Sequence, residues 1–227
     1  MKAAVLQSNY IPWAGYFELI DSVDIFCFYD EVKYTKNDWR NRNRILGPNG
    51  PFWLTIPVSK EAVNKKISEV GISDHKWQAL HYRSIRQSYA KTLGGDDDLW
   101  GILELVYMDK TWTSLSQLNQ FIVREIAGYL GITTKIVNSA DYNLKEGRVN
   151  RLVDLLLQLG SSEYVSGPSG MDYLNKEAGR FEENGIQVSY IDYNSVKRQT
   201  ASQVSVSVLD LLMRLEQTEA LDHLRHF

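Results

Sequence analysis

The stretch Met1–Asp30, which reads MKAAVLQSNYIPWAGYFELIDSVDIFCFYD, decides the fold class of this chain. Lys2 to Leu6 is a short apolar run typical of a buried strand, and Asp24 to Tyr29 is a second one. Between them, Ala14 to Ser22 carries apolar residues at helical spacing. A strand, a helix and a strand within about 30 residues form a βαβ unit, whose strands run parallel with a right-handed crossover. These residues therefore predict a Rossmann-like parallel sheet.

The rest of the chain alternates strands with helices near both ends and is mostly helical in the middle. This pattern predicts an α/β protein with a single domain over residues 1–227 and a helical insertion over residues 76–131. We expect further strands at Phe52–Val58, Thr134–Asn138, Glu163–Ser166 and Gln187–Ile191. We expect further helices at Trp77–Leu93, Leu99–Met108, Ser114–Leu130, Val149–Leu159, Gly179–Asn184 and Val208–Leu215.

Composition and charge give no indication of nucleic-acid binding, membrane insertion or secretion. The chain has 227 residues, 44% of them hydrophobic and 23% charged, with a net charge of −3 that gives no global attraction to nucleic acid or to an anionic membrane. No stretch approaches the roughly 20 apolar residues of a membrane span, and the N-terminus turns polar too early for a secretory signal. The single Cys27 lies inside a predicted strand and is expected in the core. We therefore expect a cytoplasmic protein with a small-molecule substrate and no metal site, and the oligomeric state stays open.

Three polar loops follow predicted strands, and ligands of open α/β sheets bind beyond the carboxyl ends of strands. The loops are Gln7–Gly15, Asp30–Asn43 and Ser166–Tyr173. The first loop is followed by a helix N-terminus that could receive an anion, and its glycine would let backbone approach a ligand. Its candidate ligand-binding residues are Gln7, Asn9, Tyr10, Trp13 and Gly15. The alternative is a structural turn with a packed tryptophan.

The second loop is dense in charges and amides. Guanidinium groups suit phosphate or carboxylate, and asparagine offers a donor and an acceptor together. The alternative is a solvated strand, in which every second residue faces water. The candidates for substrate binding are Tyr34, Lys36, Trp39, Arg40, Asn41, Arg42 and Asn43.

Two residues are candidates for acid–base chemistry. Asp30 follows the second strand and could act as a general base or hold an amine or sugar hydroxyl, whereas Asp24 more plausibly begins that strand. His81 is the other candidate, although a lone helical histidine is more often a packing or surface residue.

The third loop, Ser166-Gly-Pro-Ser-Gly-Met-Asp-Tyr173, could bind phosphate through its backbone N–H groups. Its candidates are Ser166, Gly167 and Tyr173. It lacks the P-loop lysine and the G-x-G-x-x-G fingerprint, so a turn between strand and helix is the alternative.

With these residues in view, the chain resembles the WbqC-like family. The likeness covers nearly the whole chain and rests on Gln7–Phe17, Asp24, Tyr29–Tyr34, Trp39–Ile45, Trp53–Val58, Tyr164–Gly167, Asp172–Leu174, Gly185–Ile186 and Ser207–Leu211. Members are associated with bacterial surface-polysaccharide gene clusters. The resemblance therefore implies a cytoplasmic transferase of O-antigen-type glycan biosynthesis, which adds an acyl or aminoacyl group to an amino sugar nucleotide. Two parts of the chain depart from the family pattern. Position 33 is Lys, where members commonly have Gln, and in the segment Tyr193–Val206 only Gln199 suggests the pattern.

The opening is also similar to that of HIGH-type nucleotidyltransferases, which have histidines on either side of the glycine. Trp13 and Tyr16 occupy those places here, so the likeness extends to the fold and not to the usual histidine chemistry. Two alternatives to acyl transfer remain: a nucleotidyl- or adenylyl-transferring enzyme, and a non-catalytic binding subunit of a glycan-biosynthesis assembly.

Overall fold

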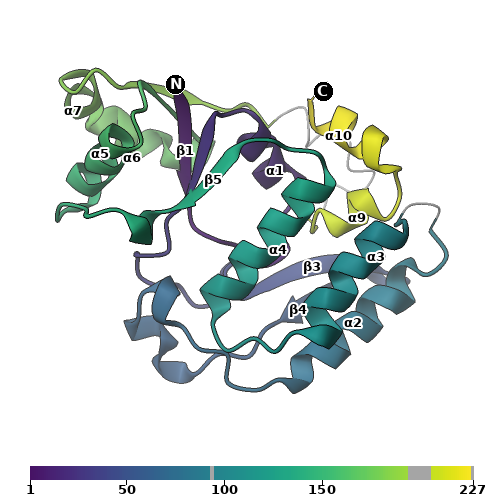
Figure 1. Ribbon diagram of the computed structural model, residues 1–227. Helices are drawn as coiled ribbons and strands as arrows, with labels where there is room; N and C mark the ends of the chain where they lie inside the picture. Colours follow the sequence, from purple (N-terminus) through teal and green to yellow (C-terminus); the bar gives the residue numbers. More distant parts are fainter. Residues whose placement is uncertain (93–94, 194–205, 226–227) are drawn as a thin grey trace.

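Five parallel strands form the central sheet of the computed structural model, which describes residues 1–92, 95–193 and 206–225 (Figure 1). Their order across the sheet is β5 (Lys135–Asn138), β2 (Ile25–Phe28), β1 (Lys2–Leu6), β6 (Glu163–Ser166) and β7 (Gln187–Tyr190). Every neighbouring pair is parallel. The predicted Rossmann-like α/β fold is confirmed.

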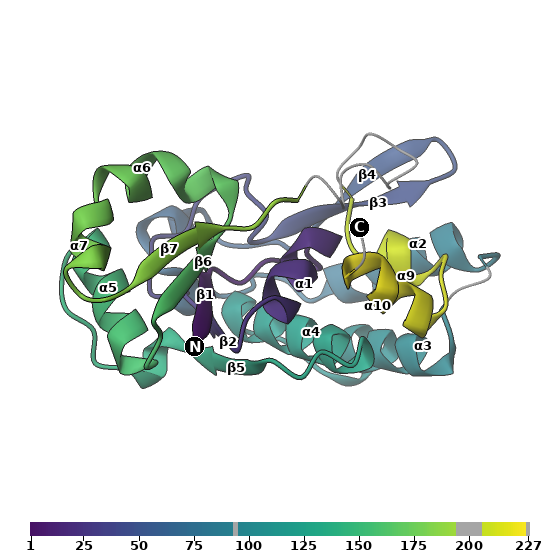
Figure 2. The same ribbon diagram turned by 90° about the horizontal axis from the view of Figure 1, so that it is seen from above.

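Helices cover both faces of this sheet, because successive side chains along a strand point to opposite faces. One core holds Ala4, Phe26 and Phe28 and packs against α1 (Ala14–Asp21) and α4 (Leu115–Tyr129). The other core holds Ala3, Ile25 and Cys27 and packs against α5 (Arg148–Gln158). Figure 2 shows α5 with α6 (Met171–Lys176) and α7 (Ala178–Glu182) on one side of the strands, and α1 and α4 on the other. Cys27 is fully buried, as expected from the sequence, and burial raises the pKa of its thiol to about 12.

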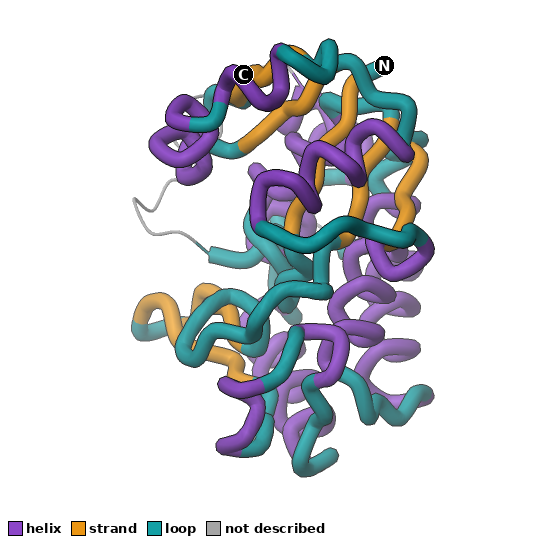
Figure 3. Tube along the Cα trace, turned by 90° about the vertical axis from the view of Figure 1, so that its left-hand side faces the viewer, coloured by secondary structure: helices purple, strands orange, loops and turns teal. Residues whose placement is uncertain are grey.

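The connection from β2 to β5 contains a separate hairpin and a group of helices. β3 (Arg42–Gly47) pairs antiparallel with β4 (Gly50–Thr55), and Figure 3 shows these two strands apart from the main sheet. The predicted strand at Phe52–Val58 therefore overlaps a hairpin strand, and it ends at Thr55. Pro57 lies beyond that end, where its missing N–H costs the ladder nothing.

Short helical turns and three helices follow the hairpin. They are η1 (Lys60–Asn64), η2 (Ile67–Glu69), α2 (Lys76–Tyr89), α3 (Asp97–Glu104) with the π-helical turn η3 (Leu105–Asp109), and α4. Of the residues between 76 and 131 that the structure describes, most therefore lie in helices, and α4 itself packs on the sheet as the element that precedes β5.

Two elements near the carboxyl terminus complete the first core. They are α9 (Leu209–Leu212) and α10 (Gln217–Arg225), and α10 is tied to α1 by a bidentate ion pair between Arg225 and Asp21, at 2.7 and 2.8 Å. Gln199, the one residue that suggests the family pattern in the segment that departs from it, lies outside the described residues. No helix in residues 1–92, 95–193 and 206–225 combines the length and apolar character that crossing a membrane requires.

Candidate functional site

The strand order places a topological switch point between β1 and β6. From β1 the chain builds outward through β2 and β5 on one side, then returns to start β6 and β7 on the other. Ligands of such sheets bind in the crevice outside the carboxyl ends of the strands at this point. The loops after β1 and β6 both begin there, so the first and third predicted loops lie at the position where such a crevice is expected.

Tyr193 joins these two loops. Its ring packs edge-on against the Trp13 indole with 4.8 Å between centroids. Its hydroxyl lies over Gly167, where an added Cβ would be 3.5 Å from the oxygen. The β1 loop and the β6 loop therefore form a single wall through Tyr193, a residue that sequence reasoning did not select.

Arg40 gathers the polar side chains of the β1 loop. Its guanidinium donates to the Asn9 Oδ1 atom and to the Gln7 Oε1 atom, the latter at 3.2 Å, and it lies 3.8 Å from the Asp38 carboxylate. Because both carboxamide oxygens face Arg40, the amide nitrogens of Gln7 and Asn9 face elsewhere as donors. Across the described part of the chain, neither nitrogen donates to a protein group, and the buried Arg40 Nε atom has no acceptor. The result is a cluster of N–H donors that suits an anionic oxygen ligand.

Asp30 fixes the β1 loop from beneath. Its side chain, 1% exposed, accepts from the Ser8 backbone N–H at 2.8 Å, from the Ser116 hydroxyl at 2.5 Å and from the Gln120 amide at 3.0 Å. Gln120 in turn accepts from Asn138 at the end of β5, at 3.0 Å. This network connects the ends of β1, β2 and β5 through the first turns of α4. Asp30 is at the predicted location, but its contacts are those of an anchor and its carboxylate is shielded from solvent.

Three buried asparagines hold the backbone around this loop. Asn119 donates to the Arg40 carbonyl at 2.8 Å, and Asn41 donates to the Ile56 carbonyl at 2.9 Å. Asn43 donates to the carbonyls of Tyr10 and Ile11, at 3.2 and 2.8 Å. Ile11 has a φ of +35°, which is unfavourable for a β-branched residue and persists only where neighbours hold it. Asn41 and Asn43 thus use their amide N–H groups to hold the backbone around the loop.

Trp13 and Gly15 form one unit at the start of α1. The Trp13 ring lies directly over Gly15, so a Cβ at that position would overlap the indole. Glycine is favoured at this position because the Trp13 side chain lies so close to it, whereas the approach of a ligand to this glycine stays a prediction.

Tyr10 points away from the crevice into the helical region. Its hydroxyl lies 2.7 Å from the His81 Nδ1 atom and 2.6 Å from the Tyr107 hydroxyl, and Trp77 packs edge-on against its ring. His81 is buried, and that burial lowers the pKa of its imidazole to about 4. The structure therefore brings His81 to Tyr10 but not to the crevice, and keeps its imidazole neutral near pH 7.

The second predicted loop has two parts, an irregular segment before Arg40 and the strand β3 after it. Tyr34 is buried, Lys36 is exposed, and Trp39 is 37% exposed. In β3, Asn43 and Ile45 face the core, while Arg42 and Arg44 lie on the opposite face with Trp53 of β4. The solvated-strand alternative correctly describes the alternation of β3, and the outward face carries an aromatic side chain as well as charges.

The β6 loop contributes backbone and an aromatic–cation group. Ser166 is buried and donates to the Gly167 carbonyl at 3.1 Å, so its hydroxyl serves the loop. Tyr173 lies beneath the Arg148 guanidinium, 4.0 Å from the ring centroid. Burial raises the pKa of the Tyr29 hydroxyl, and Arg151, which lies beside it, offsets part of that increase. Two arginines at the start of α5 therefore add positive charge at this edge of the sheet.

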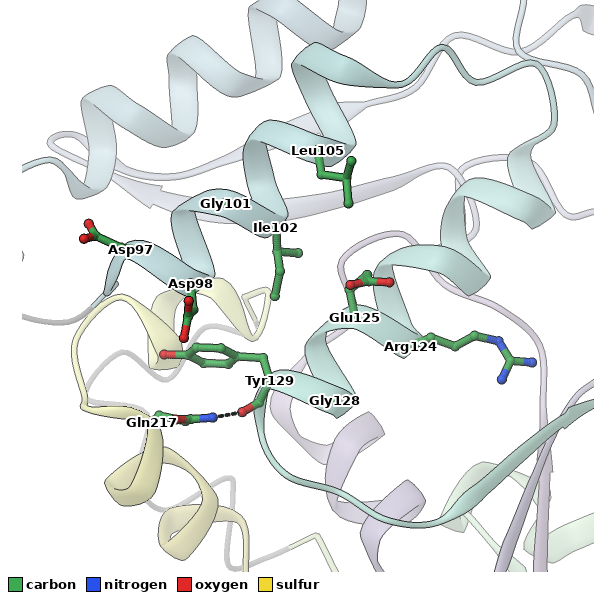
Figure 4. A pocket seen from close by; sticks show the side chains of 10 residues that line it. All are labelled: Asp97, Asp98, Gly101, Ile102, Leu105, Arg124, Glu125, Gly128, Tyr129 and Gln217. Carbon is green, nitrogen blue, oxygen red and sulfur yellow. Dashed lines mark hydrogen bonds between the residues drawn. The ribbon is translucent and has the colours of Figure 1, made fainter.

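A hollow lies away from the strand ends, between α3, α4 and α10. It is open, has a volume of ≈ 680 Å³, and is lined by Asp98, Glu125 and Tyr129 among others (Figure 4). Figure 4 shows Arg124 extending away from the other side chains. Within the described ranges, no group of three or more His, Cys, Asp or Glu side chains is arranged to hold a metal ion.

Several residues of the site were missed because they come from distant segments. These are Ser116, Asn119 and Gln120 on α4, Asn138 at the end of β5, Arg148 and Arg151 on α5, and Tyr193 after β7. The one available signal was that α4 carries polar residues at positions 116, 119 and 120, which helical spacing places on one face.

The fold defines a Rossmann-like α/β protein, and Gln7, Asn9 and Arg40 form a cluster of hydrogen-bond donors at its switch point. The chain belongs to the WbqC-like protein family, whose model matches residues 7–221, so the resemblance drawn from the sequence is confirmed. It is also 40% identical over 230 residues to the Uncharacterized protein Rv1507c of Mycobacterium tuberculosis, covering 99% of this chain and 98% of that relative.

Proposed function

We propose that this protein binds an amino sugar nucleotide at the carboxyl ends of β1 and β6 and transfers an acyl or aminoacyl group to its amine, in bacterial surface-glycan biosynthesis. The observation that carries the proposal is the donor cluster of Gln7, Asn9 and Arg40 at the switch point. A diphosphate offers only acceptor oxygens, so it complements a site that presents guanidinium and amide N–H groups. Membership of the WbqC-like family supports the glycan context.

The roles of the residues follow from their contacts. Gln7, Asn9 and Arg40 hold phosphate oxygens, and Arg148 with Tyr173 borders the opposite side of the crevice. Asp30 is a positioning residue, because its carboxylate is buried and already accepts three hydrogen bonds. We assign no proton transfer to His81, since its buried ring is paired with Tyr10.

The transfer step can proceed without a protein base. The neutral amine of the sugar attacks the acyl carbonyl carbon, a C–N bond forms, and the bond from the acyl carbon to its carrier breaks. The proton lost from the amine ends on the leaving group of the carrier. The protein then contributes mainly by orienting the two substrates, which can account for a large part of a rate enhancement.

Product formation tests the proposal. Purified protein is incubated with UDP- or dTDP-linked amino sugars and acyl-CoA or aminoacyl donors, and the sugar nucleotide is analysed by mass spectrometry. We expect a mass increase equal to the acyl or aminoacyl group. If no donor gives a shifted product while the sugar nucleotide still binds, the transfer step is wrong and a binding subunit is the better description.

A nucleotidyl-transferring activity is the second candidate, favoured by the strand order of the sheet. It predicts Mg²⁺-dependent release of pyrophosphate from a nucleoside triphosphate. The side chains flanking Gly15 argue against it, because Trp13 covers that glycine and the Tyr16 hydroxyl donates to the Gln7 carbonyl at 2.9 Å. We expect no pyrophosphate release.

A further inference from the structure

The outward face of the β3–β4 hairpin carries an unusual group of side chains. Trp39, just before β3, and Trp53, on β4, are 37% and 43% exposed, and their ring centroids are 5.6 Å apart at an interplanar angle of 35°. Large aromatic side chains gain free energy by burial, so two adjacent exposed indoles indicate a surface that another molecule covers.

Two arginines flank these indoles. The Arg42 guanidinium carbon lies 4.2 Å from the Trp53 ring centroid, and that of Arg44 lies 5.2 Å from it. The cross-strand register explains this, because Trp53 is directly opposite Arg44 and diagonal to Arg42. In the part of the chain that the structure describes, the Nε atoms of Arg42 and Arg44 are buried and have no hydrogen-bond acceptor. The hairpin thus combines aromatic faces with two guanidinium groups, and the Arg42 guanidinium also donates to the Asn37 carbonyl at 2.6 Å.

The backbone beneath this group is held firmly. The Arg44 carbonyl accepts from the Ser207 N–H at 2.8 Å, and the Leu46 N–H donates to the Tyr89 hydroxyl at 3.2 Å. The inward side chains Ile45 and Leu54 belong to the main core. A surface fixed in this way needs little ordering when a ligand binds, which favours affinity.

The hairpin is continuous with the donor cluster at the switch point. Trp39 immediately precedes Arg40, and the Trp39 carbonyl accepts from the Tyr10 N–H at 3.0 Å. The Arg40 guanidinium and the Trp39 indole are thus carried by adjacent residues, just before the hairpin begins.

We propose that Trp39, Trp53 and Arg42 form the nucleoside subsite of this protein, where the base of a nucleoside diphosphate stacks on the indoles while its phosphates extend from Arg42 toward Arg40. Stacking fits because every base has a π-face, and the guanidinium groups fit because they recognise phosphate. The inference rests on the proposed function, and it adds where the nucleotide half of the substrate lies. It leaves the crevice between β1 and β6 for the sugar.

Calorimetric titration of the full chain tests the subsite. The probes are UDP, inorganic pyrophosphate, a UDP-linked amino sugar and a single-stranded thymidine oligomer, and the variants are Trp53→Leu and Trp39→Leu. Loss of one stacking partner should weaken UDP binding by about tenfold or more and leave pyrophosphate binding unchanged. The matched control is Trp100→Leu, which removes an indole stacked with Arg86 at 4.4 Å on a different surface and should not alter UDP binding.

The outcomes separate this inference from the proposed function. Equal UDP affinity in wild type, Trp39→Leu and Trp53→Leu overturns the subsite, even if the sugar nucleotide binds. An oligomer that binds more tightly than UDP also overturns it, because the surface would then read a nucleic acid. A wild-type protein that binds UDP through Trp53 but gives no acylated product upholds the subsite and contradicts the transfer step.

Discussion

The buried carboxylate of Asp30 gives the sharpest stability prediction. Substitution Asp30→Ala removes three accepted hydrogen bonds, from the Ser8 N–H, the Ser116 hydroxyl and the Gln120 amide. A hydrogen bond to a charged group contributes about 1.5–3 kcal/mol, and donors left buried without an acceptor add their desolvation cost. Because the three bonds share one carboxylate and are not additive, we expect a loss of about 3–5 kcal/mol in the free energy of unfolding.

Urea denaturation followed by circular dichroism measures this loss. Asp24→Ala is the matched control, because Asp24 flanks the other end of the same strand, is exposed, and accepts one bond from the Lys2 N–H at 2.7 Å. We expect it to cost about 1 kcal/mol or less. If Asp30→Ala unfolds within about 1 kcal/mol of wild type, the network at the strand ends does not hold the β1 loop, and the positioning role is wrong.

Two further perturbations test buried groups that local sequence does not explain. The pKa of His81 is lowered to about 4, so an unfolded chain with an ordinary imidazole takes up a proton first as the pH falls. The free energy of unfolding should therefore be highest above pH ~6.5 and decline by about 3 kcal/mol toward pH ~4. The variant His81→Gln should lose this pH dependence, whereas the control His75→Gln, at an exposed position, should keep it. Urea titrations at several pH values measure both. Gly15→Ala should displace the Trp13 indole and change the near-ultraviolet circular dichroism. The control is Gly128→Ala, because no atom lies within 4 Å of a Cβ added there. It should leave that signal unchanged and slightly stabilise its helix. An unaltered spectrum for Gly15→Ala would show that the indole does not cover this glycine.

The βαβ opening could be predicted from sequence because its signals are local. Apolar runs, helical spacing and Pro12 all fall within the first 30 residues, and the alternation of strands with helices then implies a parallel sheet. The proposed position of the site follows from a general rule about strand ends, so Gln7 and Arg40 could be named as candidates from the sequence.

The remaining parts depend on contacts between distant segments. Gln120 meets Asp30 across 90 positions of the chain, and no periodicity reports such a pairing. The hairpin was read as one further strand because its turn, Gly47-Pro-Asn-Gly50, lies between two runs of which only the second is clearly apolar. α10 could not be predicted because it is short and carries few apolar residues, and it is held by its contact with α1.

The division of roles between Arg42 and Asn43 shows what structure adds to composition. Both were selected as possible ligand-binding residues from one polar run. Strand alternation sends Asn43 inward to the carbonyls of Tyr10 and Ile11, and sends Arg42 outward onto Trp53. The sequence carried the alternation, but only the register with β4 identified the aromatic partner.

Binding of a UDP-linked amino sugar to the Arg40→Gln variant tests the central claim most directly. Arg40 orders both amide side chains of the donor cluster, so we expect at least a tenfold loss of affinity by calorimetry, about 1.4 kcal/mol, with an unfolding midpoint that shows the variant is folded. Arg83→Gln, an exposed position on α2, serves as the control and should bind like wild type. Equal affinity in wild type, Arg40→Gln and Arg83→Gln would contradict the placement of the ligand at the carboxyl ends of β1 and β6.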